Sequence, residues 1–77
     1  MRTIEFQGHT IEYDETCIKS WKWQKALASG NDAKGVAAIE RLFMGKDEEV
    51  ADLIGDDLET MGELIGAISA ENRTAKN

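Results

Sequence analysis

The sequence predicts an α+β fold, in which an N-terminal β-hairpin packs on a small bundle of three to four short α-helices. Two observations carry this prediction. Apolar and polar residues alternate over the first thirteen positions, which is typical of paired strands with one buried face. Beyond them, apolar residues recur at helical spacing, and glycines interrupt the pattern at positions 30, 45 and 55. Seventy-seven residues without proline fit one small domain, placed at residues 1–72, followed by a polar tail at 73–77.

The hairpin is expected over residues 2–13. Its apolar face would consist of Ile4, Phe6, Ile11 and Tyr13. Gly8, as the first central residue of the turn, would suit a type II′ turn and would place Phe6 opposite Ile11. The same register sets Glu5 opposite Glu12 on the solvent face, a mildly destabilising pair of like charges.

A helix is predicted over residues 15–29, beginning after the N-cap residue Asp14 and ending at Gly30. Lysines occupy one of its faces, at Lys19, Lys22 and Lys25. The other face carries Cys17, Trp21, Trp23, Leu27 and Ala28. Because a single helix cannot cover its own apolar face, both ends of the chain are expected to pack against the tryptophans.

Three further helices are predicted, over residues 32–44, 48–54 and 57–71. Their expected caps are Asn31 or Asp32, Asp47, and Asp56 or Asp57. Their inward residues would be Val36, Ile39, Leu42 and Phe43 in the first, Val50, Leu53 and Ile54 in the second, and Leu58, Met61, Leu64, Ile65 and Ile68 in the third. Gly62 and Gly66 flank the last stripe, where another backbone could come close within the domain or across a homo-oligomer interface.

The net charge of −6 lies entirely in the C-terminal part of the chain. Residues 1–45 carry six basic and six acidic side chains, whereas residues 46–77 carry three basic and nine acidic ones. Because such a surface repels phosphate, no nucleic-acid partner is expected. The acidic part could face a basic protein or only keep the chain soluble. The lysine strip could contact an acidic partner, remain solvated, or pair with the acidic part of the same chain.

No catalytic, cofactor-binding or metal-binding constellation is recognisable. The glycines lack the spacing of a phosphate-binding loop, and His9 has no partner ligands at zinc-site spacing. We therefore expect no enzymatic activity, no cofactor and no metal. Cys17 is interpreted as a small core residue rather than a reactive thiol. With one cysteine, no apolar signal segment and no membrane-spanning run, the sequence predicts a cytoplasmic protein without a membrane partner.

Two segments carry a family resemblance: TIEFQGHTIEY, the hairpin, and ERLFMGKDEEVADLIGDDLETMGELI, a helix that ends in glycine before an acidic helical region. In layout, over most of the chain, they resemble the tail assembly chaperones of tailed phages and prophages. The resemblance implies a non-enzymatic protein of the host cytoplasm. It would hold the tape-measure protein or tail tube subunits soluble during tail assembly, through exposed helical surfaces.

Candidate partner-binding residues stand at the edges of the apolar stripes: Trp21, Trp23, Phe43, Met44 and Met61. The competing interpretation of each is a core residue. An alternative function is a small acidic inhibitor or nucleic-acid mimic, in which carboxylates from Asp47 to Glu63 stand in for phosphates and bind a DNA-binding protein. A homo-oligomer formed through the Gly62 and Gly66 flank is a third possibility.

Overall fold

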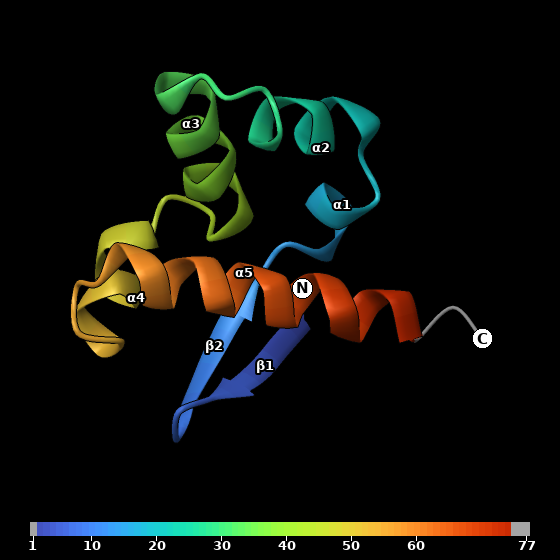
Figure 1. Cartoon of the computed structure of the whole chain (residues 1–77). Coiled ribbons are helices and arrows are strands. Elements are labelled where there is room, and N and C mark those ends of the chain that lie inside the picture. Colours follow the sequence, from blue (N-terminus) through green and yellow to red (C-terminus); the bar gives the residue numbers. More distant parts are fainter. Residues whose placement is uncertain (1, 75–77) are drawn as a thin grey trace.

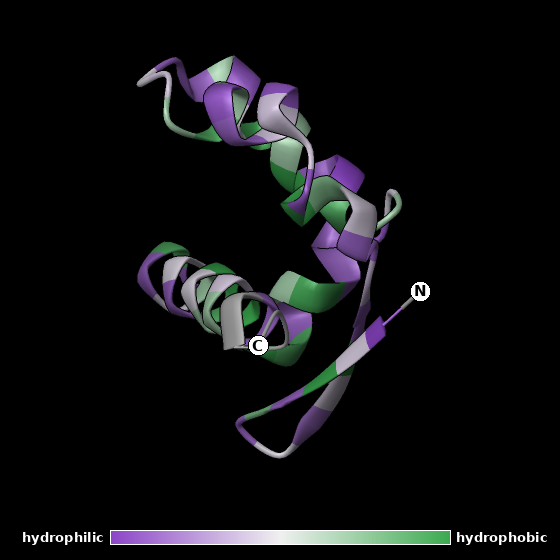
Figure 2. Cartoon of the chain, turned by 90° about the vertical axis from the view of Figure 1, so that its right-hand side faces the viewer, coloured by the Kyte–Doolittle hydropathy of each residue, from purple (hydrophilic) through white to green (hydrophobic). Residues whose placement is uncertain are grey.

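The computed structural model describes residues 2–74, with the side chains of residues 2–72, and confirms the α+β prediction. The elements in chain order are β1 (Arg2–Phe6), β2 (His9–Tyr13), α1 (Glu15–Ile18), α2 (Trp21–Leu27), α3 (Asp32–Leu42), α4 (Asp47–Leu53) and α5 (Leu58–Thr74). The hairpin and the long α5 form one part of the molecule, and α2 packs beside α3 in another part (Figure 1). The helices carry both hydrophobic and hydrophilic residues along their length, as expected of helices that bury one face (Figure 2).

The register of the hairpin differs from the predicted one. Gln7 and Gly8 are the two central residues of the turn, with φ angles of 51° and 81°. Positive φ at both positions is the signature of a type I′ turn, whose twist matches that of the flanking strands. The strands therefore pair with Ile4 opposite Ile11, both of them buried.

The new register separates the two glutamates that were expected to face each other. Glu5 lies opposite Thr10, whose hydroxyl donates a hydrogen bond to the Glu5 carboxylate. Glu12 lies opposite Thr3. A repulsive pair on the solvent face is thus replaced by a hydrogen-bonded pair and a neutral one.

The predicted helix over residues 15–29 is in fact two helices. Ser20 adopts an extended backbone and its hydroxyl accepts a hydrogen bond from the Trp23 backbone N–H at 3.2 Å, so that it caps α2. The Gln24 side-chain amide donates to the carbonyl of the last residue of α1 at 3.0 Å. The break changes which side chains share a face: Trp23 is 2% exposed and Trp21 is 75% exposed.

Side-chain caps begin three of the helices as predicted. The cap oxygens accept backbone N–H groups at 2.9–3.1 Å in Asp14, Asn31 and Asp57. The prediction that Asp47 caps a helix is wrong. Asp47 is the first residue of α4, and the N-cap residue is Lys46, which makes no side-chain cap bond. The glycines at positions 30, 45 and 55 have φ of 78–89°, the left-handed conformation that commonly ends a helix.

We expect Asp14→Ala to lower the free energy of unfolding by about 1 kcal/mol, the usual loss for a helix N-cap. Hydrogen bonds from the Thr16 hydroxyl and N–H hold the pKa of Asp14 below its ordinary value, and the equivalent bonds from Thr60 lower the pKa of Asp57. A lowered carboxyl pKa stabilises the fold above the unfolded value of about 3.9. This contribution is lost as the pH falls through the lowered pKa.

Urea titrations near pH 7 and near pH 2.5 would test the Asp14 contribution, with Glu12→Ala as an exposed carboxylate control. The difference between wild type and Asp14→Ala should shrink at the lower pH, because the contribution of the ionised cap is progressively lost once the pH falls below the unfolded pKa. A difference that stays constant across this range would show that the ionised cap does not stabilise the fold.

One hydrophobic core joins all seven elements. Its buried members are Ile4, Ile11, Tyr13, Cys17, Trp23, Ala38, Leu42, Phe43, Val50, Ile54, Met61, Leu64, Ile65 and Ile68. Besides Trp21, three residues of the later helices that were expected to face inward are exposed instead: Val36, Leu53 and Leu58. In α3 the buried face is centred on Ala38 and Leu42, one turn apart, and Val36 points to the other side of the helix. Leu58 is the first residue of α5 and precedes the part that reaches the core.

A buried polar cluster ties α5 to the hairpin. The Asn72 side-chain amide donates to the Tyr13 hydroxyl at 3.0 Å and to the Ile68 carbonyl at 2.8 Å. Arg2 donates to the Asn72 side-chain oxygen at 3.4 Å and pairs with Glu15 at 2.9 Å. Helix α5 accordingly continues to position 74, three residues past its predicted end. Positions 75–77 of the predicted tail lie outside the described residues.

The flank formed by Gly62 and Gly66 is open. A Cβ added at either glycine would meet nothing within 4 Å, so no backbone of the described domain approaches this flank. Of the two uses predicted for the glycines, close packing within the domain is therefore wrong. A homo-oligomer contact through them stays a prediction.

Candidate functional site

The structure separates the five predicted contact residues into two groups. Trp21 and Met44 are exposed, whereas the core contains Trp23, Phe43 and Met61. The buried three follow the competing interpretation, in which they fill the interior rather than contact a partner. The local signal that separates the two tryptophans is Ser20, because a serine three residues before Trp23 can cap a new helix.

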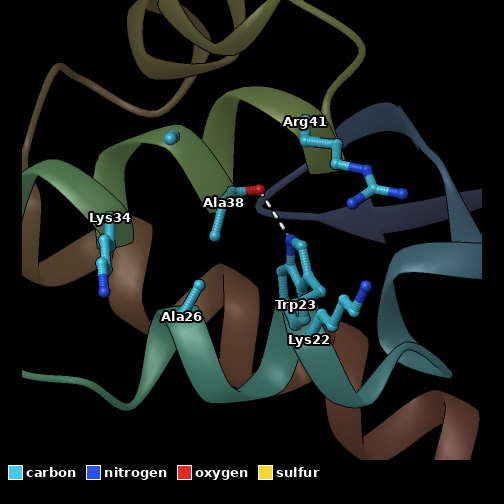
Figure 3. Close-up of a pocket in the computed structure, with 7 residues that line it drawn as sticks. Lys22, Trp23, Ala26, Lys34, Ala38 and Arg41 are labelled. Carbon is cyan, nitrogen blue, oxygen red and sulfur yellow. Dashed lines mark hydrogen bonds between the residues drawn. The ribbon is translucent and has the colours of Figure 1, made fainter.

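Trp23 belongs to α2, and its side chain is bonded to α3. Its indole N–H donates to the Ala38 carbonyl at 2.7 Å, a bond drawn in Figure 3. Because the ring is buried and its polar atom has a partner, Trp23 positions α2 against α3 rather than offering a free surface.

Trp21 is one of several large apolar side chains at the surface. The others are Leu58, Val36, Leu53 and Met44. Leu58 is 87% exposed, and it stands with Leu53 on either side of the connection from α4 to α5. Sequence periodicity assigned Val36, Leu53 and Leu58 to the interior, and only the packing of the helices shows that they are exposed.

A shallow groove lies between α2 and α3, and we call it the α2–α3 groove. It consists of two adjoining hollows of about 220 Å³ and 450 Å³. Its floor is formed by Trp23, Ala26, Ala37 and Ala38, and its rim carries Lys22, Lys25, Lys34 and Arg41. Figure 3 shows Lys22 on α2 and Lys34 and Arg41 on α3 around the alanines of the floor. Sequence analysis singled out Lys22 and Lys25 but did not connect them with Lys34 and Arg41.

All charged side chains that line the groove are basic. No side chain that lines it is acidic. Within the part of the chain that the structure describes, none of its four cations forms an ion pair with a carboxylate. The predicted lysine strip was Lys19, Lys22 and Lys25, and among the described residues none of the three pairs with the acidic C-terminal part of the chain, which was one of the predicted possibilities.

The acidic surface lies on other elements. Exposed carboxylates follow α4 and the first turns of α5 at Glu48, Glu49, Asp52, Asp56, Asp57, Glu59 and Glu63. In residues 2–74, no group of three or more histidine, cysteine, aspartate or glutamate side chains is placed to hold a metal ion. Cys17 is buried, and burial raises the pKa of its thiol. Among the described helices, none is both long enough and apolar enough to cross a bilayer.

Comparison with protein-family models, curated proteins and solved structures finds no match to this chain. Function must therefore be inferred from the surface of the fold. Two features stand out there: large apolar side chains in water, and a basic groove in an acidic protein.

Proposed function

We propose that this protein is a non-enzymatic binding module with the role of a phage tail assembly chaperone. It would hold an apolar segment of the tape-measure protein or of a tail tube subunit in solution until assembly. The observation that supports this most is Trp21, which is 75% exposed in a short helix whose other tryptophan is buried. A tryptophan that the fold does not cover has the character of an interface anchor.

The other exposed apolar residues, on and after α3 and around the connection from α4 to α5, offer further apolar contacts to a partner. Covering a side chain the size of Leu58 contributes about 1.5–3 kcal/mol, so a few such contacts supply useful affinity. Lysines flank Trp21 along α2, and carboxylates flank Leu58 at the start of α5. A charged surround of this kind keeps the module soluble while its apolar residues cover the partner.

Co-expression with the tape-measure protein encoded in the same genome would test the proposal. Wild type should raise the soluble fraction of the tape-measure protein, and Trp21→Ser combined with Leu58→Ser should remove most of that gain. Both side chains are exposed, so their replacement should leave stability within about 0.5 kcal/mol of wild type.

A matched control is Lys19→Ser combined with Lys46→Ser, which alters two exposed residues without removing apolar surface. The control should retain full solubilisation. If the Trp21 and Leu58 variant keeps the tape-measure protein as soluble as wild type does, the proposed function is wrong.

The exposed carboxylates of α4 and α5 favour a second candidate, an acidic inhibitor that imitates nucleic acid. Salt distinguishes the two functions. Binding that relies on phosphate-like charges weakens by several orders of magnitude between about 0.05 and 0.2 M salt. Binding through apolar contacts persists over that range. A captured partner that elutes at moderate salt would favour the inhibitor.

A further inference from the structure

We propose that the α2–α3 groove binds an acidic helical segment of a partner protein, whose carboxylates flank a strip of small apolar side chains. This inference rests on the proposed function as a protein-binding module, and it specifies the chemistry of one segment that the module takes.

The floor of the groove suits the close approach of a helix. Ala26 and Ala37 present only methyl groups, and Ala38 is buried, so the backbone of a bound helix can come near the floor. Trp23 closes the bottom of the groove with its indole N–H already bonded to Ala38. The floor therefore offers a bound helix an apolar surface, and its indole N–H needs no hydrogen-bond partner from that helix.

The rim supplies the charge. Lys34 and Arg41 lie seven residues apart on α3, about 10 Å along the helix axis, because each residue rises about 1.5 Å. Lys22 and Lys25 line the facing side. A helix lying along the groove with small residues at the first and fourth positions of each heptad toward the floor, and acidic residues at the fifth and seventh positions on either side of them, would place carboxylates against both rims. Since these cations have no ion-pair partner in the described chain, the occupant would supply one.

The surroundings favour a short acidic helix over nucleic acid. Residues 19–44 carry five basic and two acidic side chains, whereas the whole chain has a net charge of −6. An extended phosphate backbone would leave this short basic region and meet the carboxylates of α4 and α5. The ring of Trp23 is buried, so the floor also lacks an aromatic platform on which a base could stack.

The test uses the full chain and a synthetic probe: a fluorescein-labelled, end-capped peptide of three Ala-Ala-Ala-Ala-Glu-Ala-Glu repeats, whose glutamates lie on either side of the strip formed by the first and fourth alanines. Fluorescence anisotropy measures its affinity, and amide chemical shifts map the contact. We expect shifts at Ala26, Ala37 and Ala38, and no binding of the same peptide with glutamine in place of glutamate. Lys34→Glu combined with Arg41→Glu should weaken binding about tenfold or more.

The matched control is Lys19→Glu combined with Lys46→Glu, which changes the net charge equally but lies outside the groove. It should keep the affinity within about twofold. Because the Arg41 charge also helps to lower the pKa of Asp14, Lys34→Gln with Arg41→Gln serves as a second, milder groove variant. Circular dichroism verifies that each variant is folded.

Four outcomes would overturn the inference. The first three are equal weakening in the control, binding of the glutamine peptide, and tighter binding of a poly-thymidine oligonucleotide that the groove variants abolish. Absence of peptide binding would also overturn it. If the wild type still solubilises the tape-measure protein in that case, only the groove assignment fails and the proposed function stands.

Discussion

Trp23→Ala is expected to lower the free energy of unfolding by about 3–5 kcal/mol, the usual range for removing a buried aromatic side chain. Trp23 is the largest side chain of the core and packs α2 against α3. Its loss would leave a cavity beneath the groove and remove the bond to the Ala38 carbonyl. A domain of this size has a total stability of about 5–10 kcal/mol, so the variant should be partly unfolded at 37 °C.

Urea unfolding followed by circular dichroism measures the effect of Trp23→Ala. Trp23→Phe keeps an aromatic ring but loses the indole hydrogen bond, and it should cost less, about 1–2 kcal/mol. The matched control is Trp21→Ala, which removes the same side chain from an exposed position and should change stability by less than about 0.5 kcal/mol. Equal losses for the two alanine variants would place both tryptophans in the same environment and contradict the structure.

The difference between the tryptophans shows where prediction from periodicity fails. Apolar spacing over residues 15–29 predicts one continuous helix with both rings on one face. The competing signal is local: the Ser20 hydroxyl caps a new helix and stops the first one after a single turn. Caps at Asp14, Asn31 and Asp57 were predictable because each stands at the edge of a periodic segment, whereas Ser20 stands inside one.

The hairpin was predictable as an element but not in its register. Strand alternation is independent of the turn, and it correctly predicted the apolar face. The pairing depends on which two residues occupy the turn, and Gln7 takes a left-handed conformation that was assigned to Gly8 alone. Shifting the turn by one residue shifts every cross-strand partner, which is why the two glutamates do not meet.

The α2–α3 groove lay outside the reach of sequence reasoning. Its rim combines Lys22 and Lys25 with Lys34 and Arg41, residues from two helices whose relative placement depends on tertiary packing. Ala38 was not among the residues predicted to face inward, yet it is buried and its carbonyl accepts the hydrogen bond from the Trp23 indole. A local pattern can therefore give the basic strip of one helix, but not the groove that the second helix completes.

Asn72→Ala is expected to lower the free energy of unfolding by about 2–3 kcal/mol, because it removes two buried hydrogen bonds and leaves the Tyr13 hydroxyl without its donor. Asn72 is 7% exposed near the C-terminal end of α5, one residue past the predicted end of that helix and just before the predicted polar tail. Its contact with Tyr13 joins positions 59 residues apart, so it fixes the end of α5 against the hairpin.

A double-mutant cycle isolates this Tyr13–Asn72 contact. Tyr13→Phe alone should cost about 1 kcal/mol, and adding it to Asn72→Ala should cost less than the sum of the two, with a coupling energy of about 1 kcal/mol. Glu63→Ala, at an exposed position on α5, is the matched control and should combine additively with Tyr13→Phe. The reason for the coupling is that the second substitution removes the very hydroxyl that the first leaves unsatisfied. Strict additivity between positions 13 and 72 would mean that the contact does not stabilise the fold, and that α5 is held against the hairpin by apolar packing alone.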